Sequence, residues 1–338
     1  MQYHPYQWEQ RSQPSAYYMG RMLRRQSSAI GFTLLGIFLM MNVLAVILVL
    51  VLGRMGLIDY TQLNNGFQGI DPVAYYLMYG VYAGLGAILP VICLLRALNI
   101  SLGEILPSRR VGVKQGALCV LFGMSVCMLA NMMVNLLCAN LEQFGVNTDT
   151  GAQGYDNSPA AIALLFFSTA VMPAFMEEFV YRGVVLGMLR RFGNGVAVVG
   201  SSLLFGLMHG NIVQIPFALI VGLVLAYLVT KTGSIWVGVA LHFANNAYAC
   251  LMEVLSYQLS DGAYMLCYYL VVLAIILLGI VAAVILMRRQ LGFFVLPSAS
   301  AGPGGLGFAA AMRQMVLNPG VIAFAGVLLA QTVYLCVS

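Results

Sequence analysis

Long apolar runs recur along the whole chain and decide what it can fold into. A helix that crosses a bilayer needs about 20 apolar residues, and in lipid a helix pairs its own backbone polar groups. Runs of this kind occur at 29–53, 72–95, 116–140, 159–180, 195–210, 214–230, 234–256, 263–287 and 319–336. The sequence therefore predicts an all-α fold, a polytopic transmembrane helix bundle with about eight to nine membrane helices.

The composition excludes a soluble globular protein. Only 8% of the residues are charged and 61% are hydrophobic, whereas soluble domains carry about 25% charged residues. The runs at 195–210 and 214–230 are short, and the polar residues Asn211 and Gln214 separate them. We expect two short tilted helices in this region, or a partly re-entrant pair.

The basic residues between the runs predict the orientation of the chain. If the N-terminus is cytoplasmic, only Arg54 among these residues lies outside. The basic residues placed inside are Arg11, Arg21, Arg24, Arg25, Arg96, Arg109, Arg110, Lys114, Arg190, Arg191, Lys231, Arg288, Arg289 and Arg313. Such a bias follows the positive-inside rule, so we expect a multi-pass protein of the cell membrane with a cytoplasmic N-terminus. The net charge of +5 is then an orientation signal, and no nucleic-acid partner is expected because no reader fold accompanies it.

A small set of strongly polar side chains is expected at membrane depth, in or directly beside the apolar runs. A charged side chain in hydrocarbon costs about 3 kcal/mol or more, so such groups indicate a functional site. The set consists of Glu177, Glu178, Arg182, His209, His242, Asn245 and Asn246. The adjacent glutamates are its most unusual members.

Helical spacing divides the two glutamates. Glu178 and Arg182 are four residues apart, so they share a helix face and can form an ion pair. Glu177 points about 100° away and shares its face with Tyr181. One carboxylate is therefore expected to be structural, and the other is left free for chemistry.

The two histidines have neighbours at the same spacing. Phe205 precedes His209 by four residues, and Asn246 follows His242 by four. Asn245 is interpreted as structural. At 1.5 Å per residue, His209 lies deeper along its run than the other candidates, so the helix must tilt or start in the interface. A sharp turn is expected near Gly193.

A glutamate, two histidines and an asparagine suit the attack of water on a peptide carbonyl. A carboxylate in an apolar setting can act as a general base or acid near neutral pH, and asparagine can donate to an oxyanion. Two histidines and a glutamate also form a known catalytic zinc site, which makes Glu177, His209 and His242 possible metal ligands. The sequence has neither an HExxH motif nor a GxSxG elbow.

Three motifs in order resemble those of a known family. They are Glu-Glu-x-x-x-Arg at 177–182, Phe-x-x-x-His at 205–209 and His-x-x-x-Asn at 242–246. Together they are similar to the motifs of the CPBP family, the CAAX-protease and bacteriocin-processing (Abi) group of intramembrane proteases, which includes the prenyl-protein endopeptidase Rce1.

The resemblance implies a role for each residue. Glu177 resembles the catalytic base that acts with His209 on a water molecule, and His242 and Asn246 resemble the oxyanion pair. The ion pair next to Glu177 would position it. Both a divalent metal, such as zinc, and a metal-free glutamate mechanism are compatible with the family.

The resemblance also divides the chain into four regions. A polar and basic tail at 1–28 and transmembrane helices at 29–158 precede a CPBP-like catalytic core at 159–256. Further transmembrane helices follow at 257–338, with a Gly/Pro-rich linker at 297–305.

The function expected from these motifs is that of an intramembrane endopeptidase acting on membrane-associated peptides or proteins. The sequence leaves two alternatives open: a non-enzymatic immunity or scaffold protein of the same fold, and a proton-coupled transporter. It defines neither the substrate nor the oligomeric state.

Overall fold

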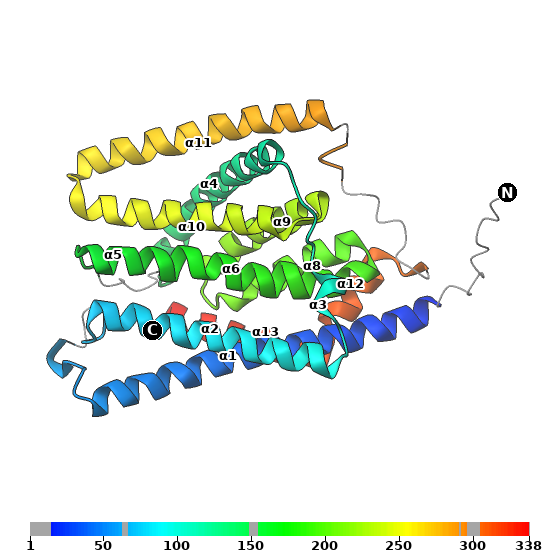
Figure 1. Ribbon diagram of the computed structural model, residues 1–338, viewed down its shortest axis with the longest axis horizontal. Helices are drawn as coiled ribbons and strands as arrows, with labels where there is room; N and C mark the ends of the chain where they lie inside the picture. The colour runs from blue at the N-terminus through cyan, green and yellow to red at the C-terminus, as the bar shows by residue number, and fades with distance from the viewer. Residues whose placement is uncertain (1–14, 63–66, 149–154, 291, 296–304, 338) are drawn as a thin grey trace, which may run out of the picture.

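The chain folds into a bundle of helices (Figure 1). The computed structural model describes residues 15–62, 67–148, 155–290, 292–295 and 305–337, and within these ranges there are helices and no strand. Eight helical segments in the described ranges are long and apolar enough to cross a membrane. They are α1 (Ala16–Arg54), α2 (Pro72–Ala97), α4 (Val113–Gln143), a helix from Pro159 to Phe192, α9 (Gln214–Thr232), α10 (Ile235–Gln258), α11 (Asp261–Arg289) and α13 (Pro319–Val337). The predicted all-α, multi-pass fold is confirmed.

Short helices fill the spaces between these segments. They are η1 (Tyr60–Gln62), α3 (Leu102–Ile105), α8 (Asn194–Met208) and α12 (Phe308–Val316). The helix α8 corresponds to the fifth predicted run, but with 15 residues it is shorter than a full span. The expected sharp turn before it is present, because Gly193 adopts a φ of +119°, a conformation that glycine reaches without steric cost.

The first helix begins earlier than its apolar run. Part of the segment predicted as a polar tail, 1–28, belongs to α1, which starts at Ala16 after the N-cap Ser15. The reason is that Met19 and Leu23 supply a buried apolar face before the continuous run begins. Residues 1–14 of that tail, and most of the predicted linker at 297–305, lie outside the described residues.

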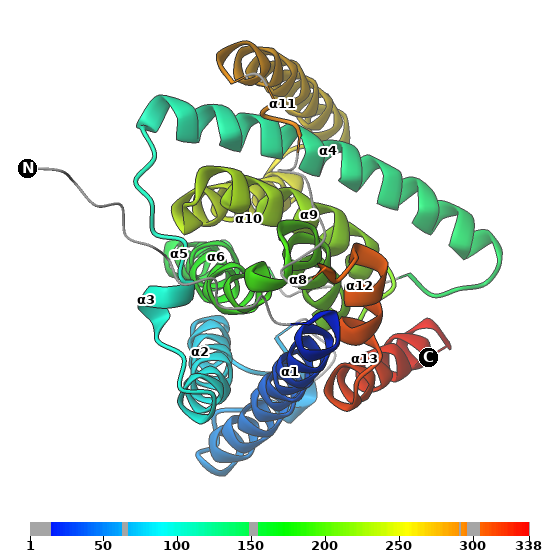
Figure 2. The same ribbon diagram turned by 90° about the vertical axis from the view of Figure 1, so that its right-hand side faces the viewer.

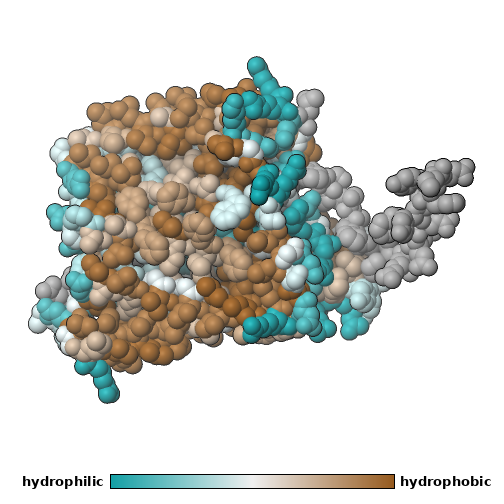
Figure 3. All heavy atoms as spheres, in the orientation of Figure 1, coloured by the Kyte–Doolittle hydropathy of each residue, from teal (hydrophilic) through white to brown (hydrophobic). Residues whose placement is uncertain are grey.

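The membrane-length helices and α8 form a central layer with one group of helices on each side (Figure 2). Figure 2 shows the helix from Pro159 to Phe192 together with α8, α9 and α10 in the middle, α1, α2 and α13 on one side, and α4 and α11 on the other. Apolar side chains cover the visible middle of the molecule, and hydrophilic ones gather at its two ends (Figure 3). The start of α1 and the end of α11, which both carry arginines, lie at the same end (Figure 1). The cytoplasmic position of that end stays a prediction.

The first and last membrane helices meet at a contact between glycines. A Cβ atom built on Gly320 of α13 would lie 1.9 Å from the carbonyl oxygen of Ser28 on α1, and one built on Gly31 would lie 2.3 Å from the carbonyl carbon of Gly320. The backbone N–H of Gly320 donates to the Ser28 hydroxyl at 3.1 Å. Small residues allow such close approach between membrane helices, and this contact holds α13 against α1.

Replacement of Gly320 by valine should therefore destabilise the protein. The added side chain has no space against α1, so we expect a loss of about 1–3 kcal/mol and a lower thermal unfolding midpoint in detergent. Gly326→Val is the matched control, because no atom lies within 4 Å of a Cβ at Gly326 on the same helix. Equal midpoints for the two variants would contradict the close contact.

Candidate active site

The two glutamates lie between two π-helical turns. The helix from Pro159 to Phe192 is made of α5 (Pro159–Phe166), η2 (Phe167–Val171), α6 (Met172–Glu178), η3 (Phe179–Val185), α7 (Leu186–Leu189) and η4 (Arg190–Phe192), with η2 and η3 wound as π-helix. Both glutamates end α6. Because π-turns in helices occur frequently at functional sites, their positions on either side of α6 single out this part of the helix.

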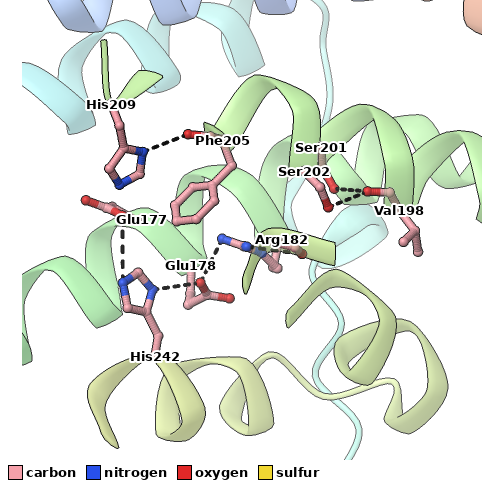
Figure 4. Close-up of polar contacts among 10 residues, drawn as sticks. Glu177, Glu178, Arg182, Val198, Ser201, Ser202, Phe205, His209 and His242 are labelled. Atoms are coloured by element: carbon pink, nitrogen blue, oxygen red, sulfur yellow. Dashed lines mark hydrogen bonds and ion pairs between the residues drawn. The ribbon is translucent and has the colours of Figure 1, made fainter. Parts of the chain in front are cut away.

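Glu178 is the centre of a buried polar network. Its Oε1 accepts hydrogen bonds from Arg182 Nη1 at 2.8 Å and from His242 Nδ1 at 2.9 Å (Figure 4). All three side chains are buried, with Glu178 and Arg182 fully enclosed. The predicted Glu178–Arg182 ion pair is thus present, and it also fixes His242 on α10.

The surroundings of Arg182 complete this network. Its guanidinium lies 4.2 Å from the ring centroid of Phe205, and its Nη2 donates to the Gly222 carbonyl at 3.4 Å. On the other side, a Cβ built on Gly238 would lie 2.6 Å from Glu178 Oε2. The absence of a side chain at Gly238 therefore leaves the space that the buried carboxylate occupies.

Glu177 lies at the edge of this network, on the other side of the His242 ring (Figure 4). Its side chain is 36% exposed, while that of Glu178 is 0% exposed. Glu177 Oε2 is 3.8 Å from His242 Nε2, too far for a direct hydrogen bond but within the range that a bridging water can span. The division of the glutamates by helical phase is therefore present in the structure.

His209 lies opposite, at the end of α8. Its Nδ1 is 2.9 Å from the carbonyl oxygen of Phe205, and its ring packs edge-to-face on that of Phe205, with centroids 5.0 Å apart. The next residue, Gly210, has a φ of +57°, which ends the helix and lets the chain turn away. The Phe205 ring also contacts His242, with a centroid separation of 6.0 Å, so one phenyl group orients both histidines.

Asn246 is held in one orientation by two neighbours. Its Nδ2 donates to the Thr169 carbonyl at 3.0 Å, and its Oδ1 accepts from Asn245 Nδ2 at 3.2 Å. Pro173, four residues after Thr169, has no N–H to offer that carbonyl, and the Asn246 amide supplies a donor to it. A side-chain amide has two N–H groups, so one remains for a ligand. Asn245, which sequence reasoning treated only as structural, orients this amide.

A cavity of about 220 Å³, here named the polar cavity, lies next to the buried network. It lies between the helix from Pro159 to Phe192, α8, α9 and α10. Its lining includes the four residues predicted to be catalytic, Glu177, His209, His242 and Asn246. Tyr79 of α2 also lines it, and sequence reasoning missed this residue because a tyrosine in an apolar run carries no distinctive signal.

The metal prediction meets a geometric difficulty. In the described residues, no three His, Cys, Asp or Glu side chains are close enough together to hold a metal ion. Glu177, His209 and His242 therefore do not fit a metal as they stand. Both histidines have Nδ1 engaged and direct only Nε2 to the cavity (Figure 4).

The described chain is thus a helical protein with eight candidate membrane spans, and a glutamate, two histidines and an asparagine line one of its cavities. Residues 159–248 match the family model of Rce1-like type II CAAX prenyl endopeptidases, so the chain contains a domain of the Rce1-like (CPBP) family. A protein of Bacillus subtilis (strain 168) named "Putative membrane peptidase YdiL" is 25% identical over 95 residues, which are 28% of this chain and 39% of that protein. No solved structure matches.

The buried network predicts an unusual response to mutation. Arg182→Met should destabilise the protein by about 3 kcal/mol or more, because it leaves the Glu178 carboxylate buried without its cation. The double variant Glu178→Gln/Arg182→Met should lose less stability than Arg182→Met alone, since no unpaired charge remains buried. Chemical denaturation in detergent would measure both. A double variant less stable than Arg182→Met alone would contradict the charge argument.

Proposed function

We propose that the protein is an intramembrane endopeptidase that hydrolyses peptide bonds in membrane-associated peptides or proteins. The observation that carries this proposal is the convergence of Glu177, His209, His242 and Asn246 on the polar cavity. The residues come from three helical segments far apart in the sequence, and their side chains match the needs of water attack on an amide. The membership of residues 159–248 in a family of endopeptidases supports it.

Glu177 is proposed as the general base. Its carboxylate takes a proton from a water molecule in the polar cavity while the water oxygen bonds to the carbonyl carbon of the substrate. When the C–N bond breaks, the same carboxyl group gives the proton to the leaving amine. Its partial exposure to the cavity suits this exchange, and the burial of Glu178 excludes the neighbour from it.

The tautomers of the histidines follow from their partners. A carbonyl oxygen can only accept, so His209 Nδ1 carries the proton toward Phe205, and in neutral His209 Nε2 presents a lone pair. His209 can therefore hold the water through one of its hydrogens. His242 donates from Nδ1 to Glu178, so its Nε2 stabilises an oxyanion only as the imidazolium.

Asn246 is proposed as the neutral donor to the oxyanion. Its carbonyl end accepts from Asn245 and one N–H donates to Thr169, which leaves its second N–H as a fixed donor. Preorganised donors of this type contribute about 2.7–4 kcal/mol to transition-state stabilisation. Together with His242 it forms the proposed oxyanion site.

The central test is proteolysis by the full chain in proteoliposomes. A library of internally quenched fluorescent peptides supplies the substrate, because the natural one is not defined. Glu177→Gln keeps the shape but cannot accept the proton, so we expect a fall in kcat/KM of about 10²–10⁴-fold. The matched control is Glu142→Gln, the same change on an exposed residue at the end of α4. Wild-type activity in Glu177→Gln, with cleavage by the wild type established, would disprove the role of this carboxylate.

Metal dependence is a separate question with its own test. Since the side chains as placed do not form a three-ligand set, we expect 1,10-phenanthroline to leave kcat/KM within about twofold and elemental analysis to find far less than one zinc per chain. Loss of activity that added zinc restores would show instead that Glu177, His209 and His242 close around a metal.

A further inference from the structure

A second cavity adjoins the polar cavity. It has a volume of about 360 Å³, within the range of small-molecule and side-chain sites, and is named here the methionine pocket. Residues of α1, α2, α6, η3, α13 and the end of α8 line it. Four residues, Tyr79, Pro173, Glu177 and His209, line both cavities. An occupant of the methionine pocket would therefore lie directly beside the proposed reacting atoms.

The wall of the pocket is apolar and adaptable. Four methionines line it, Met41, Met172, Met176 and Met208, and no lysine, arginine or aspartate does. Methionine side chains are flexible, fill irregular spaces and make favourable contacts with aromatic rings. Glu177 and His209 lie where the pocket meets the polar cavity. The rest of the wall suits a large uncharged group, and it disfavours an anionic one, which would lose its hydration without a lysine or arginine partner.

Two carboxamides add polar groups to this wall. Asn42 of α1 and Gln331 of α13 both line the pocket. A Cβ built on Gly210 would lie 3.1 Å from Gln331 Nε2, so the Gln331 amide packs against the residue that follows His209. Carboxamides can pair with the backbone of a peptide, whereas a hydrocarbon chain offers them nothing. This favours a peptide over a lipid as the occupant.

More than half of the residues that line the pocket lie outside the family domain. α1, α2 and α13 lie before or after residues 159–248, and Figure 2 shows them together on one side of the central helices. The proposed catalytic residues are supplied by the domain, while these flanking helices supply the opposite wall.

We propose that the methionine pocket binds the side chain of a large apolar substrate residue next to the scissile bond, and that α1 and α13 set its size limit. This inference rests on the proposed function, because it assigns a subsite to that reaction. The substrate class is a membrane-associated peptide with a bulky uncharged residue, such as leucine, methionine or phenylalanine, beside the cleaved bond.

The first test narrows the pocket without touching the proposed catalytic groups. Ala45 of α1 lines the pocket, and its neighbour Val46 does not line it and is 59% exposed. With peptides that differ only in the residues flanking the cleaved bond, the wild type should prefer leucine over alanine at one of these positions. Ala45→Phe should lower that preference by about 10-fold or more, since even one methylene in an apolar pocket is worth about 10–200-fold.

Val46→Phe is the matched control, the same bulk added one position away on the exposed face. It should keep the wild-type preference. An unchanged preference in Ala45→Phe, with cleavage intact, would overturn the subsite, and so would a wild type that prefers small or charged residues at both positions.

A second measurement does not depend on cleavage. A peptide that carries the photoreactive residue benzoylphenylalanine is irradiated with the Glu177→Gln protein in proteoliposomes, and the attachment sites are mapped by mass spectrometry. We expect the peptide to attach at Met41 or Met208. The yield of this attachment should fall at least about fivefold when Ala45→Phe is added. Attachment confined to lipid-facing α11 would overturn the inference, as would a lipid that copurifies with the wild type and is displaced by Ala45→Phe. A wild type that cleaves no peptide would defeat the proposed function, while the attachment sites would still decide the subsite.

Discussion

The site depends on the hydrogen bonds that the buried carboxylate of Glu178 accepts. One oxygen atom joins Arg182 on its own helix to His242 on α10. A charge at this depth is tolerated only with such partners, so the two helices are held in one relative position. Because the buried charge needs both partners, the network fixes the position of α6 relative to α10. Glu177, one residue earlier on the same helix, is thereby placed beside the polar cavity.

Much of this arrangement was predictable from the sequence, because membranes restrict both fold and polarity. Most of the apolar runs gave the helix ends to within about three residues, but α1 begins earlier, at Ala16, and the fourth helix continues from the predicted end at 180 to Phe192. The phase of Glu177 and Glu178 separated the partly exposed carboxylate from the buried one. The boundary of α1 was not predictable, since Met19 and Leu23 become buried only when the other helices pack on them.

Other features depend on tertiary contacts and left little or no signal in the sequence. The bond from Asn246 to the Thr169 carbonyl joins residues 77 positions apart, and no local pattern specifies it. Asn42 and Gln331 are carboxamides within predicted runs, a weak indication of their place beside a pocket. The metal question could not be decided from residue types, because it depends on how closely three side chains approach.

The glycine contact between α1 and α13 also has a consequence for biosynthesis. The groups proposed for catalysis are all present once α10 has been made, but the wall from α13 follows only after α11 and α12. Every residue that lines the polar cavity is therefore synthesised before Gln331, which α13 adds to the methionine pocket. Docking of Gly320 against α1 is then the contact that completes the wall of the methionine pocket.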